Sequence, residues 1–459
     1  MRTLSLCVAI GLTASVSGLG QVEEANAASI KSALATAYNE NPELNAQRAA
    51  TRAADEALPQ AKAGFRPTII GNADYGHTRT VTKTAFRTTG TTLNPYGFGV
   101  TISQSLFAGF RNIRSVEAAK SSIYASRETL RNVEQNTLFN AASAYADVIQ
   151  AQQILDIRRR NIGFLAEQLR ASQARLDVGE GTRTDVAQSQ ARLALARAQL
   201  SAAQATLAAA AGTYRQIIGK DPRSLTPPKG PRRLYASSLQ QAISIANREH
   251  PAIKATQHLV DVALFNVKIA ESALLPSVTV EGALNRRFNA SGPDTRTDSA
   301  SVTARLRVPI YQGGSEYSTI RQNKQTLGQR RIEVDQTRDQ VRNAVVSAWT
   351  QLQAANANLS ANEAQVRAAR LALSGVIEER KVGQRTTLEV LDAQSDVLSA
   401  QELQVQSRRN IVVAGYALVS AMGRLNSSRL RLKVAHYSPK RHYEEVKDKW
   451  FGLRTPNGR

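Results

Sequence analysis

The sequence is poor in cysteine and in aromatic residues: its 459 residues include one cysteine, Cys7, and only 5% are Phe, Trp or Tyr. Cys7 lies within the apolar run Leu4–Leu12, which precedes the small-residue site Ala25-Asn26-Ala27. This pattern predicts a secretory signal peptide over residues 1–27, with a mature chain that begins near Ala28. Removal of the signal peptide removes the cysteine, which excludes disulfide bonds and thiol chemistry.

Long apolar runs are also absent. The sequence has no stretch of about 18 consecutive apolar residues, the length that a membrane-spanning α-helix needs. An exported chain of this composition that crosses a membrane would therefore have to cross it with β-strands.

Residue patterns that carry catalysis are missing as well. The five histidines show no metal-ligand spacing, and there is no phosphate-binding loop, nucleophile elbow or cysteine cluster. Pro251 directly follows His250, which favours a turn or surface role for this histidine. We therefore expect no enzyme activity, no cofactor and no metal site. The histidines are His77, His250, His258, His436 and His442.

Acidic residues are outnumbered by basic ones, 37 to 59, which gives a net charge of +22. The basic residues are scattered and form no basic and aromatic stacking surface, which argues against nucleic-acid binding. Their densest cluster is the C-terminal tail, residues 427–459. This tail is expected either to contact anionic partners, such as peptidoglycan or lipid headgroups, or to be solvated and partly disordered. Because the internally duplicated part of the chain ends near Leu425, removal of Ser427–Arg459 should leave assembly intact.

What the sequence does contain is an internal duplication. Ser29–Leu44 matches Ser238–Ile253, and three glycines of the first half match three of the second at a constant offset. These pairs are Gly109 with Gly313, Gly179 with Gly383, and Gly219 with Gly423. The sequence thus predicts a first repeat over residues 28–219, a Pro-rich linker over 220–237 and a second repeat over 238–426.

Each repeat contains a long helical hairpin, residues 110–218 and 314–423. Between Gly109 and Gly179 there is no proline and only one glycine, Gly163, which predicts a helix of about 65 residues, or roughly 100 Å. The chain then turns back at Gly179 or Gly383 into a helix of about 36 residues. Apolar residues spaced seven apart in the return helices indicate coiled-coil packing.

Before each long helix lies a strand pair, residues 66–108 and 275–311. The predicted strands are Pro67–His77, Val100–Phe107, Pro276–Ala283 and Val302–Val308, separated by loops at Thr78–Asn94 and Asn289–Asp298. Two chains would supply eight strands with a filled interior, whereas three would supply twelve strands and a lumen that can hold the inward-facing Arg305 and Arg307. The alternative is two hairpins that cap a helical bundle in solution.

The motif that follows the second turn is specific. Val382–Gln394, VGQRTTLEVLDAQ, together with the duplicated arrangement over Ser29–Leu425, resembles the TolC family of outer-membrane efflux and secretion channels. The resemblance implies an α+β membrane protein that forms a homotrimer, with a twelve-stranded β-barrel continued by a long α-helical coiled-coil tunnel. It also implies a periplasmic adaptor protein and an inner-membrane RND or ABC transporter as partners, and it places the linker in a belt around the tunnel.

The same resemblance implies a periplasmic gate. In the family, the hairpin of the second repeat is the inner, mobile one. An arginine after its Val-Gly links it to a Thr-Asp pair on the first-repeat hairpin of a neighbouring chain, and the matching residues here are Arg385, Thr184 and Asp185. Family members usually have a tyrosine three residues before the glycine of the second turn, here Gly383. This chain has Arg380 at that position, which could form an ion pair with Asp185.

Local roles compete with the gate roles. Thr386 to Glu389 fits a helix capping box and Thr182 to Asp185 resembles one, so the two acids could simply start their helices. Asp392 lies beyond the first turn on the face of Glu389. In a trimer, Glu389 and Asp392 would form a ring of six carboxylates at a constriction and attract cations.

We therefore expect an outer-membrane export duct for small toxic compounds, for type I protein secretion or for both. The alternative is a soluble periplasmic coiled-coil adaptor or structural protein. Neither the cargo nor the partner pump can be deduced from the sequence, because a passive duct receives its substrate from the pump to which it docks.

Overall fold

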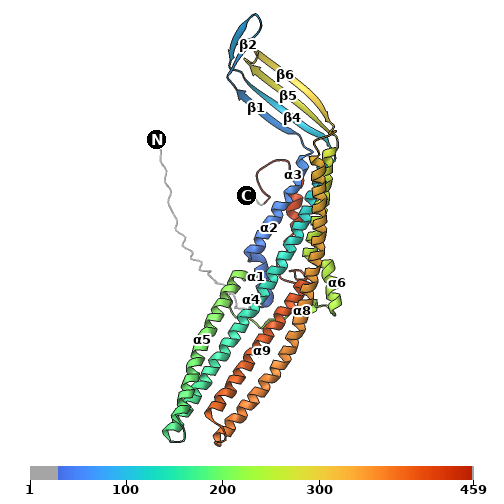
Figure 1. Ribbon diagram of the computed structural model, residues 1–459. Helices are drawn as coiled ribbons and strands as arrows, with labels where there is room; N and C mark the ends of the chain where they lie inside the picture. Colours follow the sequence, from blue (N-terminus) through green and yellow to red (C-terminus); the bar gives the residue numbers. More distant parts are fainter. Residues whose placement is uncertain (1–28, 457–459) are drawn as a thin grey trace, which may run out of the picture.

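The computed structural model describes residues 29–456 of the chain, so the predicted signal peptide lies outside the described residues. Two long helical hairpins run side by side, with a curved β-sheet at one end and the helical turns at the other (Figure 1). Within residues 29–456, no helix combines the length and the apolar composition needed to cross a bilayer.

The long helices are α4, Arg111–Asp177, and α8, Ser315–Lys381, each of 67 residues, as the sequence predicts. At 1.5 Å per residue each is about 100 Å long. The return helices are α5, Arg183–Ile218, and α9, Thr387–Ala421. Their heptad residues Val186 and Leu193 are buried, which agrees with the predicted coiled-coil packing.

Short helices cover the half of each long helix that the return helices leave free. In the first half these are α1, Ile30–Glu40, α2, Pro42–Asp55, and α3, Ala57–Ala63. In the second half they are α6, Leu239–Glu249, and α7, Pro251–Glu271, with 3-10 turns at Arg232–Leu234 and Ser272–Leu274.

His250 has the turn role that the sequence predicts. It caps α7, because its Nδ1 accepts a hydrogen bond from the backbone amide of Ala252 at 3.2 Å. Burial lowers the pKa of His250 to about 4, so the ring is neutral and able to accept this bond near pH 7.

The main sheet is antiparallel with the strand order β1-β4-β5-β6. These strands are β1, Thr68–Tyr75, β4, Tyr96–Ala108, β5, Ser277–Phe288, and β6, Arg296–Arg307. The strands β4, β5 and β6 are longer than predicted, because their polar ends still pair in register with their neighbours.

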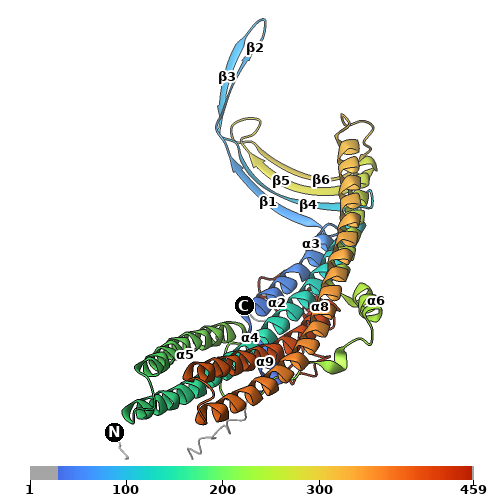
Figure 2. The ribbon, with the colours of Figure 1, turned by 60° about the horizontal axis from the view of Figure 1, so that its bottom comes forward.

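The prediction that Thr78–Asn94 is only a loop is wrong. This segment forms a second, two-stranded sheet from β2, Thr78–Lys83, and β3, Thr88–Leu93, which projects beyond the main sheet (Figure 2). The segment is rich in threonine, whose β-branched side chain favours extended backbone. The polar composition of this segment suggests a loop, but backbone pairing between its two halves makes it a hairpin.

The main core lies midway along the molecule, where α1, α4, α6, α8 and α9 meet. Tyr145, Leu138 and Leu418 are fully buried there. The linker packs on this core through Tyr235, whose hydroxyl occupies the space beside Gly415 of α9. Any larger residue at position 415 would displace the linker.

The tail is folded over most of its described length, so the interpretation as a solvated, disordered tail is wrong for residues 427–446. Leu430 and Leu432 are buried in the main core. A short helix, α10, Pro439–Val446, packs on α2 and buries His442 and Val446. Composition concealed this packing because three buried apolar residues hold a segment that is otherwise charged.

A candidate gate at the helical tips

The two helical turns lie together at the end of the molecule farthest from the sheet (Figure 1). Gly179 and Gly383 adopt left-handed backbone with φ of 82° and 78°, which favours glycine at both positions. In the first turn the amide of Glu180 donates to the carbonyl of Arg175 at 2.9 Å, and in the second Gln384 donates to Glu379 at 3.0 Å. Both turns therefore close their long helices in the same way.

Asp185 completes a capping box at the start of α5, the local role that competes with gating. Its backbone amide donates to Thr182 Oγ1 at 3.1 Å, and its Oδ2 accepts from the Thr182 hydroxyl at 2.6 Å. The Thr182 hydroxyl holds the pKa of Asp185 below its usual value. The bonds of Asp185 within the chain therefore serve to cap α5.

Glu389 completes the matching capping box at the start of α9. Its Oε2 accepts from the Thr386 amide at 2.7 Å, and its amide donates to Thr386 Oγ1 at 3.3 Å. Its Oε1 accepts from Arg385 Nη1 at 2.8 Å. The Thr386 amide, followed by Arg385, lowers the pKa of Glu389 to about 2, so this acid is ionised across the physiological range.

Arg385 is exposed and forms two ion pairs within its own hairpin. Besides Glu389 it bonds Glu379, with its Nε 2.7 Å from Oε2 of that residue. Within this chain Arg385 does not contact Thr184 or Asp185, and Thr184 is exposed on the first turn of α5. A link from Arg385 to a neighbouring chain would therefore compete with these two carboxylates.

Arg380 contacts the first hairpin of its own chain. It is half-buried on α8, and its Nη1 donates to Gln168 Oε1 of α4 at 2.9 Å. Burial lowers the pKa of Arg380, whereas the charge of Asp185 opposes that shift. Arg380 thus connects the two hairpins of a single chain and lies in the electrostatic reach of Asp185.

Asp392 is paired as well. Its Oδ1 accepts from Arg192 Nη2 of α5 at 2.6 Å. The predicted carboxylate ring therefore consists of two acids that are each bonded to an arginine of the same chain, Glu389 to Arg385 and Asp392 to Arg192. Its net negative charge is smaller than six free carboxylates would give.

Sequence reasoning missed a ladder of polar links between α4 and α9. Gln394 Nε2 donates to Asn161 Oδ1 at 2.9 Å, and Arg409 Nε donates to Asp147 at 2.7 Å. Arg158 bonds Glu402, whose pKa is raised by burial. The sequence does show polar residues within the alanine-rich packing faces of these helices. Their spacing along one helix, however, does not specify which residue of the other helix they contact.

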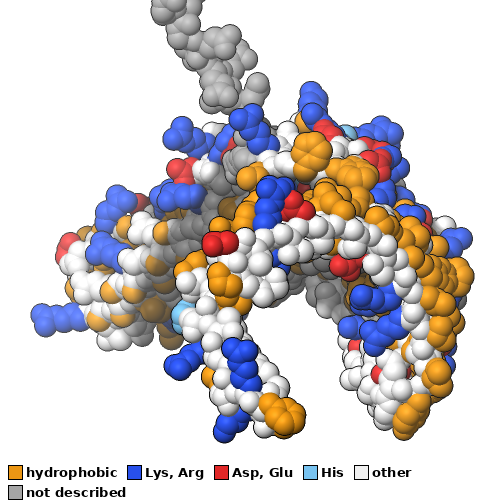
Figure 3. All heavy atoms as spheres, turned by 90° about the horizontal axis from the view of Figure 1, so that it is seen from above, with side chains coloured by type: hydrophobic (Ala, Val, Ile, Leu, Met, Phe, Trp, Pro, Cys, Tyr) orange, Lys and Arg blue, Asp and Glu red, His pale blue; other side chains and the backbone are white. Residues whose placement is uncertain are grey.

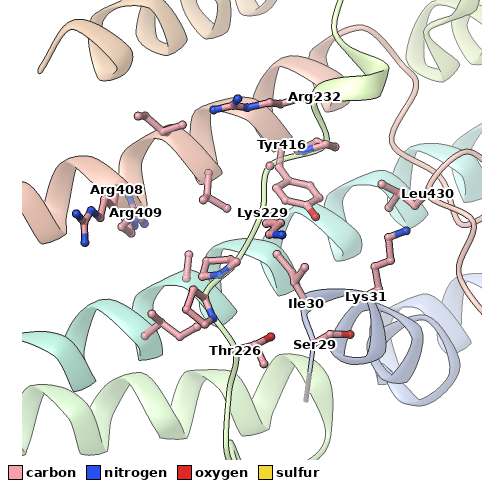
Figure 4. A pocket seen from close by; sticks show the side chains of 18 of the residues that line it. Ser29, Ile30, Lys31, Thr226, Lys229, Arg232, Arg408, Arg409, Tyr416 and Leu430 are labelled. Atoms are coloured by element: carbon pink, nitrogen blue, oxygen red, sulfur yellow. The ribbon is translucent and has the colours of Figure 1, made fainter. Parts of the chain in front are cut away.

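A large cavity lies at the middle of the molecule, away from these tips. It has a volume of about 1390 Å³ and opens between α4, α9 and the linker (Figure 4). Its lining includes Lys31, Lys229, Arg232 and Arg408, and no acidic side chain. Among residues 29–456, no three His, Cys, Asp or Glu side chains gather in a way that could hold a metal ion.

The model of the outer membrane efflux protein family matches residues 33–220 and 242–424 of this chain, one segment in each half. The chain belongs to the outer membrane efflux protein family. Membership assigns it to the outer membrane as an efflux or secretion channel, and it confirms the resemblance to TolC. The family consists of channel proteins, which agrees with the expectation that the chain is not an enzyme.

Individual efflux proteins support this assignment. The chain is 47% identical to the outer membrane efflux protein BepC of Brucella suis over 93% of this chain and 92% of BepC. It is 25% identical to TolC of Vibrio cholerae, over 86% of this chain and 91% of TolC. The crystal structure of the CmeC outer membrane channel of Campylobacter jejuni has the same fold, with a TM-score of 0.76, 15% identity and coverage of 91% and 89% of the two chains.

Proposed function

We propose that three copies of this chain assemble into one export duct. Their twelve strands form a β-barrel through the outer membrane, and their long helices continue it as a tunnel across the periplasm. The duct works with a periplasmic adaptor protein and an inner-membrane RND or ABC transporter, and it carries small toxic compounds, secreted proteins or both. The two 67-residue helices and the two capping boxes support an origin by internal duplication.

The observation that carries this proposal is the division of the main sheet into one apolar and one polar face. Directly opposed residues share a face of an antiparallel sheet. One row across the four strands is Ile69, Ile102, Gly282 and Val302, and the next row is Thr68, Ser103, Glu281 and Thr303.

Nothing among residues 29–456 covers the apolar face. Ile69 is 67% exposed and Val302 is 83% exposed, although both are strongly apolar. Seen from above, hydrophobic side chains follow the outer edge of the curved sheet, while Lys and Arg side chains lie within its curve (Figure 3). The apolar face is suited to contact with lipid, and the polar face is suited to contact with water.

Strand length matches a membrane. The strands β4, β5 and β6 have 13, 12 and 12 residues, or about 40 Å at 3.3 Å per residue. Tilted by about 45°, they span roughly 28 Å, close to the thickness of a hydrocarbon core.

The need to close the sheet into a barrel explains the number of chains. The edge strands β1 and β6 have no partner on their outer sides among residues 29–456. Pairing β6 of one chain with β1 of the next removes these edges, and three chains form the smallest barrel with an aqueous lumen. Arg305 and Arg307 then face that lumen.

The tips form the gate of this duct. In the closed trimer, Arg385 and Arg380 link the inner hairpin to Thr184 and Asp185 of a neighbouring chain, and Glu389 with Asp392 forms a carboxylate constriction. The position of Arg380 supports this assignment, because it lies where the two hairpins meet and its charge acts on Asp185. Gly179 and Gly383 keep the turns narrow enough for six hairpins to converge.

A soluble periplasmic adaptor is the second candidate, and the exposed apolar sheet face argues against it. The deciding experiment is reconstitution of purified protein into planar lipid bilayers, together with electrophoresis of unheated samples. We expect ion conductance and a trimer that resists denaturation. A detergent-independent monomer without conductance would overturn the proposed duct.

A further inference from the structure

The end of the described chain exposes three large apolar side chains. Trp450, Phe451 and Leu453 are 65%, 89% and 102% exposed. They lie on a loop that is held in shape, because Lys449 Nζ donates to the carbonyl of Arg454 and Gly452 turns the backbone with φ of 109°. A folded loop that presents such side chains to solvent lacks its partner.

This loop is fastened beside the point where the chain enters the sheet. Arg66, two residues before β1, stacks on the Trp450 ring with its guanidinium carbon 4.6 Å from the ring centroid. Arg66 Nη1 also donates to the Lys449 carbonyl at 2.8 Å, and Lys62 of α3 pairs with Asp448 at 2.5 Å. Figure 1 shows the end of the chain alongside α2 and α3, below the sheet.

The apolar surface continues from the loop onto the base of the sheet. Trp450 shares a cavity of about 480 Å³ with Phe65, Ile113 and Val116, and the last two lie on the first turns of α4. Phe65 and Ile113 are themselves about half exposed. Val116 lies five residues into α4, which places the loop within about 10 Å of the strand ends.

Cations without acidic partners surround this surface. Lys447 pairs with Glu444 and Arg441 with Glu445, so the tail's acids are occupied. Among residues 29–456, Arg66, Lys449 and Arg454 at the loop form no ion pair, whereas the two acids of the cavity, Glu117 and Asp448, are paired with lysines. Aromatic side chains with flanking cations at the end of a membrane-spanning element are typical of the membrane–water interface.

We propose that the loop 447–454 is an interfacial anchor that inserts Trp450, Phe451 and Leu453 among the phospholipid headgroups of the periplasmic leaflet, while Arg454 and its neighbours contact lipid phosphates. This inference rests on the proposed barrel, which sets the depth of the sheet in the membrane. The tail thereby fixes the height of the helical tunnel relative to the bilayer.

The chain provides its own reporter, because it contains only two tryptophans, Trp349 and Trp450. Trp349 lies 34 residues into α8, about 50 Å from the sheet end of that helix. A Trp349→Phe variant reports on the loop alone, and a Trp450→Phe variant is the matched control. Both are reconstituted as full-length channels into phosphatidylcholine and phosphatidylglycerol vesicles that contain lipids brominated near the headgroup.

We expect bromine to lower the Trp450 emission about twofold, as for other tryptophans at an interface, and to leave the Trp349 emission unchanged. Unquenched Trp450 emission in vesicles that conduct would overturn the anchor while the barrel stands, and a blue-shifted spectrum would then assign the loop to a neighbouring chain. Vesicles that neither conduct nor retain the protein would overturn both the barrel and the anchor.

Discussion

His442 and Asp55 are 387 positions apart in the chain, and Nδ1 of His442 lies 3.2 Å from Oδ2 of Asp55. Asp55 is completely buried, and Arg127 Nη2 lies 3.6 Å from its other oxygen. Arg127 in turn packs against the ring of Tyr443, 4.8 Å from the ring centroid. The helix α10 therefore supplies one hydrogen bond to a buried carboxylate of α2 and an aromatic ring against the arginine beside it, which ties the tail to the first repeat.

Replacing His442 with alanine should destabilise the channel by about 1–3 kcal/mol, because it removes a hydrogen bond to a buried carboxylate. The measurement is the temperature at which the oligomer dissociates in detergent. Arg441→Ala, on the same helix but at an exposed position, is the control and should change stability little. Adding Asp55→Asn to His442→Ala should recover part of the loss, and no recovery would show that the carboxylate is not the group left unsatisfied.

Truncation of the tail separates its two parts. Removing residues 427–459 deletes the buried Leu430, Leu432 and Val446, each worth about 1.5–3 kcal/mol of burial, so the trimer should dissociate at lower temperature. This replaces the expectation that assembly survives unchanged, which followed from the end of the duplicated core near Leu425. Removing only residues 447–459 leaves these side chains in place and should preserve stability. If the protein without residues 427–459 is as stable as the full-length protein, the tail does not pack as described.

The double substitution Arg380→Ser with Arg385→Ser should raise conductance several-fold, because it removes the cations that hold neighbouring tips together. Single-channel recording in planar bilayers measures the effect. Arg183→Ser removes an exposed arginine of the same tip that forms no ion pair among the described residues, and it should leave conductance unchanged. If the double variant forms trimers at normal levels and its conductance is unchanged, these arginines do not hold the gate closed and serve only to bond groups within their own chain.

The carboxylates of the tip should control block by multivalent cations. Glu389→Ala with Asp392→Ala removes the acids of the constriction, so cation block should weaken. Arg192→Ser should do the reverse, since it frees Asp392 from its ion pair and makes the ring more negative. Both effects are read as the half-blocking concentration of a trivalent cation, and a shift in the same direction for both variants would refute the ring.

The pH dependence of stability follows from the lowered pKa values of Asp185 and Glu389. A carboxylate whose pKa is lowered in the folded state stabilises that state above its unfolded pKa, and the stabilisation disappears as the pH falls through the folded pKa. For Glu389 this window runs from 4.5 down to about 2. The temperature at which the oligomer dissociates should therefore stay constant from pH 8 to pH 5 and fall only in stronger acid, and Glu389→Gln should remove the contribution of Glu389 to that fall. A fall between pH 8 and pH 6 would require a different titrating group.

Much of the long-helix architecture could be predicted from the sequence because it depends on local interactions. A run of good helix formers without proline makes α4 and α8, and a glycine with positive φ ends each of them. The two capping boxes also join residues only three apart, so the spacing of Thr182 with Asp185 and of Thr386 with Glu389 was sufficient to find them.

Contacts between distant residues were decided by the tertiary structure alone. Asp392 bonds Arg192 and Arg380 bonds Gln168 because of how the two hairpins pack, which side-chain spacing along one helix does not specify. The packing of the tail could not be predicted for the same reason. Its composition is mostly charged, and the few apolar residues that pack against the main core and α2 do not stand out. Periodicity determined which residues share a face, but the relative rotation and height of the packed helices determined which of them meet.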